Sequence, residues 1–291
     1  MSDFSLQEFD EIESTQNYLC ELLKENVSNR AEPKAAKLEK VEKLEKVEKV
    51  EKVEKVEKLE KVEKVEKIEK LEKVEKVENA ENSENGKSIQ KTGKNAKSAA
   101  VSTAKPFPKI AVLAKTQSKG RGSGQNTWSS PKGNLYLSFS LPNSDLEGIP
   151  EASLSIYFMQ IARNLLRDLG SRAFCKWPND LYLMLDGKPK KVGGLITSRL
   201  KSGVVVGLGI NFKEVPKDQD IAGLMDLKIE AKTFAQTYLA KLLARPSFDL
   251  VFMDFARDFD DFKAHFEALK DAKLYADGSI QVGKERKYSL R

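Results

Sequence analysis

Apolar residues recur with the spacing of helices and strands in two separate parts of this 291-residue chain. Near the start, residues 12–25 place three leucines on one helical face, and Ser14 or Thr15 can cap the first turn. From residue 105 onward, short apolar runs alternate with stretches whose apolar residues lie three or four positions apart. Gly, Pro, Asn and Asp separate these runs, as expected of turns. The pattern predicts a core built from both parts.

The later part is expected to contain six strands and three helices. The strands fall at 109–115, 134–141, 174–176, 181–185, 192–198 and 204–212. The helices fall at 151–169, 228–244 and 247–269. The pair Asp277-Gly278 is typical of a tight turn and predicts a small C-terminal hairpin.

Two of these helices carry an apolar stripe. In the first, the residues on one face are Leu154, Phe158, Ile161, Leu165 and Leu169. In the last, the phenylalanines at helical spacing are Phe252, Phe255, Phe259, Phe262 and Phe266. Such stripes indicate packing against a core rather than a ligand site. The one histidine of the chain, His265, lies beside the phenylalanines, and we expect it to have a surface or packing role.

Residues 28–105 are polar and repetitive. From Leu38 to Asn79 a triplet repeats fourteen times, thirteen times as apolar-Glu-Lys and finally as Val-Glu-Asn. Most of its glutamates have Lys four residues later, which favours a solvated helix, but Val fills most apolar positions and is a mediocre helix former. A period of three makes the apolar stripe drift around a helix, which disfavours a conventional coiled coil. A helical arm and a disordered segment both fit this composition.

The predicted organisation is one folded domain interrupted by an insertion. Residues 1–27 and 106–270 would form the domain, 28–105 the insertion, and 271–291 the small C-terminal hairpin. We interpret the insertion, with its repeat at 38–79, as an expansion of a surface loop. A selected spacer or docking arm is the alternative.

Charge and cysteine content limit the classes of function. The chain has 50 basic and 44 acidic residues, a net charge of +6, which allows an acidic or phosphorylated partner. It has no helix-turn-helix pattern, zinc-finger spacing or aromatic ribonucleoprotein motif, and we expect no nucleic-acid-binding role. Cys20 and Cys175 lack the spacing of a disulfide framework or a zinc site. Neither a secretory signal nor a membrane-spanning run is present, which predicts a cytoplasmic protein that does not bind membranes.

A glycine-rich segment carries the first candidate chemistry. Residues 117–128 read QSKGRGSGQNTW and follow an apolar strand. Three glycines within five positions let the backbone approach an anion, and Arg121 adds a planar charged donor. The segment indicates phosphate chemistry, although a flexible loop could have the same composition.

Four further segments accompany this loop. Residues 14–19 read STQNYL, 176–180 KWPND, 191–196 KVGGLI and 207–211 GLGIN. With the GRGSGQNTW of residues 120–128, they resemble the catalytic signatures of biotin–protein ligases in order and approximate spacing. The resemblance covers residues 10–25 and 105–215 and becomes looser toward the end of the chain.

The resemblance implies an ATP-dependent ligase that forms biotinyl-5′-AMP and transfers biotin to a lysine of a biotin carboxyl carrier protein. It implies ATP and Mg²⁺ as cofactors, biotin as substrate and a biotin-dependent carboxylase as the source of the carrier, and it allows a homodimer. The implied fold is α/β (α+β), a mixed sheet backed by helices and related to class II aminoacyl-tRNA synthetases. Biotin carboxylate and phosphate are both anions, so the site needs fixed cations.

The resemblance also assigns roles to the matching positions. The catalytic residues would be Lys191, Arg121 and Asp180. The biotin-binding residues would be Ser14, Thr15, Gln117, Gly120, Arg121, Trp128, Tyr136, Lys191 and Gly194. The ATP-binding or adenylate-binding residues would be Gly120, Arg121, Gly122, Lys176, Asn179, Lys191, Gly209 and Asn211. Asp180 could hold Mg²⁺ or orient the incoming amine, and turn capping is the alternative. Lys176 could instead be a surface charge. Trp128 could instead order the loop.

Two positions depart from the family pattern. Gln16 stands where Asn is usual after Ser-Thr, and Ser123 stands where a second arginine usually follows Gly-Arg-Gly. The resemblance implies that such an arginine helps to close the loop on the adenylate. We therefore predict a leakier adenylate and less selective lysine labelling than is usual in the family.

Other functions remain as alternatives. A lipoate or octanoate ligase shares the fold and the acyl-transfer chemistry, but its arginine–serine–glycine-rich signature is missing. A structural protein built on the Glu-Lys arm is an alternative of another class, and deletion of residues 28–105 separates it, because ligase activity should survive. A biotin-sensing repressor needs a DNA-binding domain before the catalytic one, and we expect none ahead of Ser14.

Overall fold

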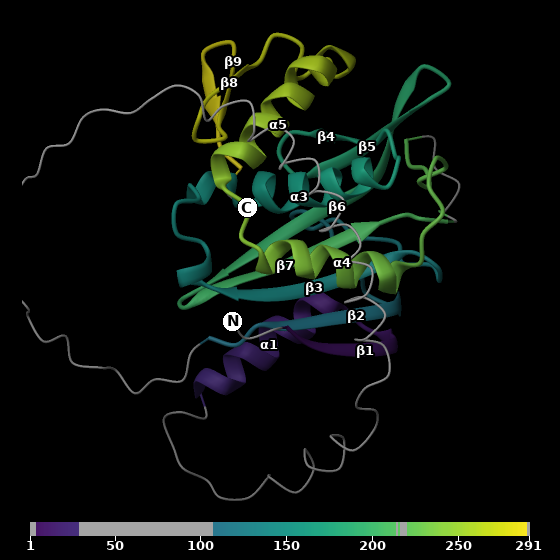
Figure 1. The fold of residues 1–291 in the computed structure, drawn as a ribbon, viewed down its shortest axis with the longest axis vertical. Helices are drawn as coiled ribbons and strands as arrows, with labels where there is room; N and C mark the ends of the chain where they lie inside the picture. Colours follow the sequence, from purple (N-terminus) through teal and green to yellow (C-terminus); the bar gives the residue numbers. More distant parts are fainter. Residues whose placement is uncertain (1–3, 29–106, 214, 216–219, 290–291) are drawn as a thin grey trace, which may run out of the picture. The chain divides into compact units, whose positions relative to one another are not determined.

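The computed structural model describes residues 4–28, 107–213, 215 and 220–289 (Figure 1). The described residues belong to one unit, formed by the start of the chain and the part after the repeat. The predicted insertion at 28–105 lies almost entirely outside the described residues. Whether its repeat is helical or disordered therefore stays a sequence-based question.

A seven-stranded sheet forms the centre of the fold (Figure 1). Its strands are β1 (Ser5–Ile12), β2 (Ile110–Gln117), β3 (Leu135–Pro142), β4 (Phe174–Lys176), β5 (Asp180–Leu185), β6 (Lys188–Leu200) and β7 (Gly203–Ile210). Their order across the sheet is β1-β2-β3-β7-β6-β5-β4. The pair β1 and β2 is parallel, and the other neighbouring pairs are antiparallel. The predicted mixed sheet is confirmed.

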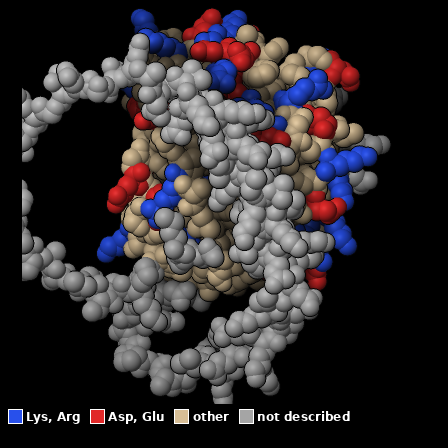
Figure 2. Space-filling model, in the orientation of Figure 1, with Lys and Arg blue, Asp and Glu red and all other residues tan. Residues whose placement is uncertain are grey.

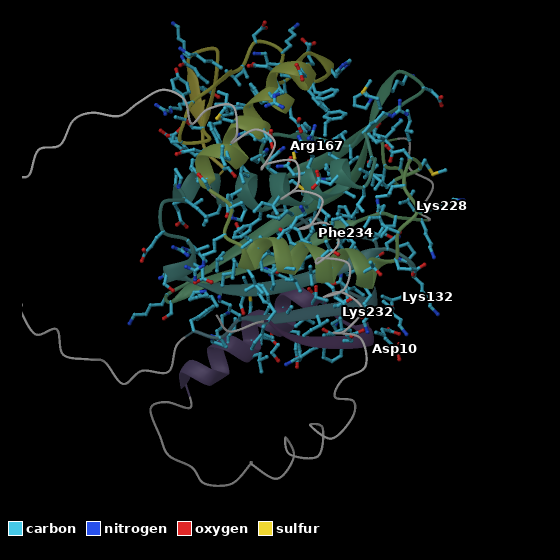
Figure 3. All side chains as sticks on the ribbon, viewed as in Figure 1. Asp10, Lys132, Arg167, Lys228, Lys232 and Phe234 are labelled. Atoms are coloured by element: carbon cyan, nitrogen blue, oxygen red, sulfur yellow. The ribbon has the colours of Figure 1, made fainter. Side chains whose placement is uncertain are left out.

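Helices cover both faces of this sheet. The helix α1 (Thr15–Ser28) packs on β2, β3 and β7, where Leu19 and Leu23 meet Val112 and Val205. The helices on the other face are α3 (Leu154–Asp168), α4 (Ala231–Leu243) and α5 (Phe248–Phe262). Successive strand residues point to opposite faces, so the neighbours of Val112 and Val205 join the larger core under these three helices. On α4, Phe234 is fully buried in that core (Figure 3).

Several predicted helix ends differ from the observed ones. The turn Glu151–Ser153 before α3 is a 3₁₀ helix, and Leu169 follows the end of α3 and is 41% exposed rather than packed with its stripe. The helix α4 begins at Ala231 rather than 228, and α5 ends at Phe262 with a 3₁₀ turn after it. The ends of a helix are set by its capping residues and adjoining turns, and the spacing of apolar residues does not reveal where they fall.

The phenylalanine stripe packs as predicted. Phe255 and Phe259 are buried, and Phe262 stacks on Phe174 of β4 with ring centroids 3.9 Å apart. His265 is exposed beside them. The stripe therefore serves the core, and the histidine lies at the surface.

The C-terminal strands form a second sheet. The strands β8 (Lys273–Leu274), β9 (Ile280–Val282) and β10 (Glu285–Lys287) are antiparallel in the order β10-β9-β8. The Asp277-Gly278 turn joins β8 to β9, and β10 adds a third strand to the predicted hairpin. The indole Nε1 of Trp177 donates to the carbonyl of Gly278 at 2.8 Å, which ties this sheet to the KWPND segment.

The surface carries both signs of charge. On the face shown in Figure 2, basic and acidic side chains are interspersed. At one edge of the domain, Asp10 lies near Lys132 and Lys232 (Figure 3). Within the described part of the chain, no helix is both long enough and apolar enough to span a bilayer.

Candidate active site

Strand register assembles the floor of a pocket on the sheet face that α1 also covers. One row across four strands consists of Tyr136, Gly209, Gly194 and Asp180. The next row consists of Ser138, Gly207 and Ile196. Residues two apart on a strand share a face, so both rows line the same side of the sheet. Glycine fills both middle positions of the first row and the middle position of the second, so no side chain rises from the floor there.

A bulge in β6 aims Lys191 at this floor. The pairing with β5 shifts between Leu181 and Tyr182, which leaves Val192 as the extra residue. Lys191 and Gly194 are three residues apart and would face opposite sides of a regular strand, but one extra residue restores a common side. Accordingly, the side-chain Cε of Lys191 lies 3.5 Å from the position that a Cβ on Gly194 would occupy.

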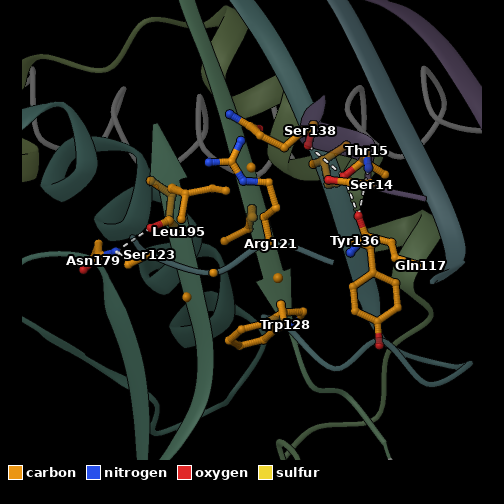
Figure 4. Close-up of a pocket in the computed structure, with 18 of the residues that line it drawn as sticks. Ser14, Thr15, Gln117, Arg121, Ser123, Trp128, Tyr136, Ser138, Asn179 and Leu195 are labelled. Atoms are coloured by element: carbon orange, nitrogen blue, oxygen red, sulfur yellow. Dashed lines mark hydrogen bonds between the residues drawn. The ribbon is translucent and has the colours of Figure 1, made fainter. Parts of the chain in front are cut away.

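The pocket lies between the first turn of α1, the glycine-rich loop and strands β3, β6 and β7 (Figure 4). Its volume is about 50 Å³. The sequence-predicted residues that line it are Ser14, Thr15, Gln117, Arg121, Gly122, Trp128, Tyr136, Asn179, Asp180, Lys191, Gly194 and Gly209. The predicted residues outside its lining are Gly120, Lys176 and Asn211.

One end of the pocket is polar and uncharged (Figure 4). The hydroxyl of Thr15 donates to Gln117 Oε1 at 3.1 Å and lies 2.8 Å from Ser138 Oγ. The backbone N–H of Thr15 donates to the same Gln117 oxygen at 2.8 Å, and Ser14 Oγ accepts from Asn17 N at 3.4 Å as the cap of α1. These buried groups already satisfy one another and therefore have a fixed geometry.

The other end of the pocket carries the charges. Lys191 Nζ lies 2.7 Å from Asp180 Oδ1, and the two side chains are 28% and 20% exposed. The same ammonium lies 5.8 Å from the centre of the Trp128 ring. Arg121 Nη1 donates to Asn17 Oδ1 at 2.9 Å, which places its guanidinium beside the first turn of α1. Both cations line the pocket, and Lys191 is the one that is paired with a carboxylate.

The indole of Trp128 covers the central glycines. A Cβ added to Gly209 would lie 2.8 Å from Trp128 Cε2, and one added to Gly194 would lie 3.4 Å from Cζ3. The indole Nε1 is buried and has no hydrogen-bond partner among the described residues. Glycine at 209 is therefore required for the ring to approach the strand, and the indole N–H is left available for an acceptor.

The glycine-rich loop folds back on itself. Gly122 N donates to Asn126 O at 2.8 Å, and Trp128 N donates to Gly120 O at 2.8 Å. A Cβ on Gly120 would lie 2.3 Å from the carbonyl oxygen of Trp128, so only glycine fits there. The Gly122 amide is thus already paired within the loop, whereas the charged side chain of Arg121 is exposed.

Asn179 anchors the loop to β6. Its side-chain Nδ2 donates to Ser123 Oγ at 3.1 Å and to Leu195 O at 2.5 Å (Figure 4). Ser123, the position where the family usually has arginine, therefore makes a neutral contact. Tyr136 lines the pocket with its ring while its hydroxyl donates to Pro131 O at 2.7 Å, and burial raises the pKa of Tyr136 to about 12.

Lys176 and Asn211 lie apart from this cavity. Lys176 Nζ lies 5.2 Å from the ring centre of Tyr182 and 4.9 Å from that of Phe266, and burial lowers the pKa of Lys176. The side chain of Asn211 donates to Ala222 O at 3.3 Å. It thereby holds the 220–224 segment, whose Ala222 N donates to the carbonyl of Lys191.

Sequence reasoning gave no site role to eight residues that line the pocket: Gln16, Ser123, Leu137, Ser138, Leu195, Ile196, Gly207 and Leu208. Ser138 and Gly207 are neighbours only through the register of β3 and β7, which no local motif reports. Gln16 was noticed only as a departure from a family pattern. Among the described residues, no cluster of three His, Cys, Asp or Glu side chains could form a metal site by itself.

Comparison with known proteins gives consistent results. The sequence pattern of the biotin/lipoate A/B protein ligase family matches residues 85–212. A biotin–protein ligase of Schizosaccharomyces pombe is 33% identical over 137 residues, 40% of this chain and 22% of that protein. The bifunctional ligase/repressor BirA of Salmonella typhimurium is 35% identical over 144 residues, 46% of this chain and 43% of that protein. The matched stretches therefore span less than half of these relatives.

Solved structures share the fold. The biotin acetyl coenzyme A carboxylase synthetase of Helicobacter pylori, with bound biotinylated ATP, has a TM-score of 0.63 and is 24% identical. The match covers 98% of this chain and 100% of that one. The biotin protein ligase of Leishmania major, in complex with biotinyl-5-AMP, has a TM-score of 0.52 at 15% identity and covers 95% and 93% of the two chains.

Proposed function

The chain belongs to the biotin/lipoate A/B protein ligase family, and on that premise we propose that it is a biotin–protein ligase. It would form biotinyl-5′-AMP from biotin and ATP and then transfer the biotinyl group to a lysine of a carrier protein. The observation that carries this proposal is a single pocket with a fixed neutral polar end and a cationic end. Biotin has a ureido ring at one end and a carboxylate at the other, and these match the two ends.

In the first step, a carboxylate oxygen of biotin attacks the α-phosphorus of ATP and pyrophosphate leaves. Two anions must meet, so fixed cations lower the barrier more than they favour either reactant alone. Lys191 and Arg121 are the cations that line the pocket. We assign Lys191 to both reacting anions and Arg121 to the adenylate phosphate. Each would exchange its present partner, Asp180 or Asn17, for substrate oxygen atoms.

In the second step, the lysine Nε of the carrier attacks the acyl carbon, AMP leaves and the amine loses a proton. Asp180 is the carboxylate that lines the pocket beside Lys191. Once phosphate draws Lys191 away, Asp180 can accept a hydrogen bond from the incoming amine and orient it. Trp128 would pack against the ligand and offer its unpaired indole N–H.

The same proposal assigns further residues to the nucleotide and to Mg²⁺. Gly120, Gly122, Asn179 and Gly209 would border the adenylate, and Asn211 would act by holding the 220–224 segment beside Lys191. Mg²⁺ usually takes one or two carboxylates together with substrate phosphates and water. Asp180 is a single carboxylate beside the pocket and fits that pattern, so it is the residue that would hold Mg²⁺. Bound Mg²⁺ would offset phosphate charge.

The acceptor that we propose is the carrier domain of a biotin-dependent carboxylase. The Helicobacter pylori relative is a synthetase of acetyl coenzyme A carboxylase, and the curated relatives are biotin ligases. Lipoate ligation is the second candidate, because the family includes lipoate ligases. The neutral polar end favours biotin, since an apolar dithiolane ring offers no hydrogen-bond donor or acceptor of comparable strength to its buried hydroxyl and amide groups.

Mass spectrometry of a carrier domain tests the proposal. The carrier is incubated with the full chain, ATP, Mg²⁺ and either biotin or lipoate, and the mass added to one lysine is measured. Biotin is expected to be added and lipoate is not. Addition of lipoate in preference to biotin, or of neither, would overturn the proposal. A chain that lacks residues 28–105 should retain the activity, because the pocket residues lie outside that segment.

A further inference from the structure

A buried amide oxygen faces the neutral end of the pocket without a partner. Gln16 is 2% exposed and lines the pocket from the first turn of α1. Its Oε1 has no hydrogen-bond donor among the described residues. A buried carbonyl that gives up water without gaining a donor destabilises the folded protein, so such a group is usually completed by a ligand or by an ordered water.

The orientation of this amide is fixed by its surroundings. Gln16 Nε2 donates to the backbone carbonyl of Val205 at 3.1 Å and to Ser198 Oγ at 3.1 Å. The Val205 carbonyl can only accept, so the nitrogen must face it and the oxygen must face the other way. Both N–H donors are then used, on two neighbouring strands. The side chain cannot turn to satisfy its own oxygen without breaking these bonds.

The strand position next to Gln16 Oε1 is a glycine, Gly207, which leaves room for this oxygen. A Cβ on Gly207 would lie 2.7 Å from Gln16 Oε1 and 3.1 Å from Ile196 Cγ1. Glycine at 207 therefore accommodates the carbonyl. The neighbouring hydrogen-bonded group of Thr15, Gln117 and Ser138 is already satisfied internally, whereas Gln16 presents a free acceptor beside it.

We infer that Gln16 is a specificity-determining residue that accepts a hydrogen bond from a ureido N–H of biotin. This inference rests on the proposed function. A ureido group has two N–H donors and one carbonyl acceptor, so it needs an acceptor in the wall of its pocket as well as donors. Gln16 supplies that acceptor from a rigidly held side chain. An apolar ring without N–H groups would pack against the same carbonyl and leave the carbonyl unpaired. Such a ring would therefore bind more weakly.

The test combines variants of Gln16 with N-methylated biotins. Gln16→Met has a similar shape without the acceptor, and Ser198→Ala removes one of the two anchors while keeping Gln16. The full chain, each variant and each ligand are compared by the rate of pyrophosphate release with saturating ATP. Thermal unfolding of every variant without ligand identifies any that do not fold.

The variant Gln16→Met should raise the KM for biotin about tenfold, the value of one lost hydrogen bond, while kcat stays within about twofold. Methylation of one ureido nitrogen should impair the wild type by a similar factor but should have little further effect on Gln16→Met. Ser198→Ala should lie between the two proteins. The inference would be overturned if methylation of either ureido nitrogen changed the KM by the same factor in Gln16→Met as in the wild type. That result would indicate that a water, and not biotin, donates to Gln16.

Failure of the proposed function gives a different result. In that case, wild-type protein would release no pyrophosphate with biotin and ATP, whatever residue 16 is. A folded Gln16→Met protein with unchanged KM would contradict the role of Gln16 while leaving the ligase activity intact. If Gln16→Met does not fold, Gln16→Asn provides the second variant, because it keeps the amide but withdraws the oxygen. Its KM for biotin should rise, and an unchanged value would contradict the inference.

Discussion

The two ends of the pocket are built in different ways. At the neutral end, Thr15 and Ser138 are buried and hydrogen-bonded in a closed group with Gln117. At the charged end, Lys191 is partly exposed and paired with Asp180, whereas Arg121 contacts Asn17 in the first turn of α1. The neutral end therefore keeps its geometry before the ligand arrives, whereas the charged end must exchange partners when anions enter. Recognition of the ring and activation of the carboxylate are thus separated in space.

Removal of the ammonium at the charged end should have the largest effect. For Lys191→Ala we expect the rate of pyrophosphate release with biotin to fall by roughly 10²–10³-fold, because a preorganised positive group facing developing charge is lost. Lys190→Ala is the matched control, since Lys190 is adjacent in sequence but does not line the pocket. Equal losses in the two variants would contradict the distinct role of Lys191.

The packing between the two ends can be tested by filling a glycine. For Gly209→Ala we expect the free energy of unfolding to fall by about 1–3 kcal/mol, because the new methyl group overlaps the indole of Trp128. Gly194→Ala is the control, since its methyl group would make ordinary contacts of 3.4–3.5 Å. Urea unfolding measures both. A second change, Trp128→Ala, should relieve the strain in Gly209→Ala, and persistence of the strain would refute the overlap.

A defect at the neutral end should affect binding rather than chemistry. Thr15→Val removes the hydroxyl that joins Ser138 to Gln117. We expect the KM for biotin to rise about tenfold, as for the loss of a buried hydrogen bond, with little change in kcat. Thr116→Val is the control, because the Thr116 hydroxyl bonds to Asp10 O at the surface outside the pocket. A large fall in kcat for Thr15→Val would show that the two ends are not separate.

Position 123 should give the smallest effect. A second cavity of about 470 Å³ is lined in part by Ser123, Asn179 and Leu195, and it leaves room for a longer side chain. For Ser123→Arg we expect the biotinyl adenylate to stay bound several-fold longer during gel filtration, through added charge-assisted bonds to phosphate. Ser123→Gln is the uncharged control. Retention that is already complete in the wild type would contradict the expected leak.

The sequence predicted the elements whose signals are local. The strands after residue 107, the cap at Ser14 and the phenylalanine stripe follow from periodicity and turn residues. It did not predict β1, because this mostly polar edge strand pairs in parallel with β2 about one hundred residues later, as in Ser5 with Ile110. Such pairing leaves no mark in a short window.

The residues of the candidate site likewise include some with a local sequence signal and some without one. Residues within contiguous motifs, such as Lys191 and Asp180, could be named before the structure was known. Ser138 and Gly207 could not, since cross-strand register alone brings them together. The bulge at Val192, which turns Lys191 toward the floor, also has no clear sequence signal. Motifs thus name residues at both ends of the pocket, whereas cross-strand register adds Ser138 and Gly207.

A crystal structure of the full chain with a non-hydrolysable biotinyl adenylate would show which end of the ligand meets which end of the pocket. We predict that the ureido ring lies against Thr15 and Gln117, and that the phosphate lies within hydrogen-bond distance of Lys191 Nζ, which has left Asp180. A reversed ligand, with phosphate at the neutral end, or a ligand bound outside this pocket, would show that the two ends do not have these roles.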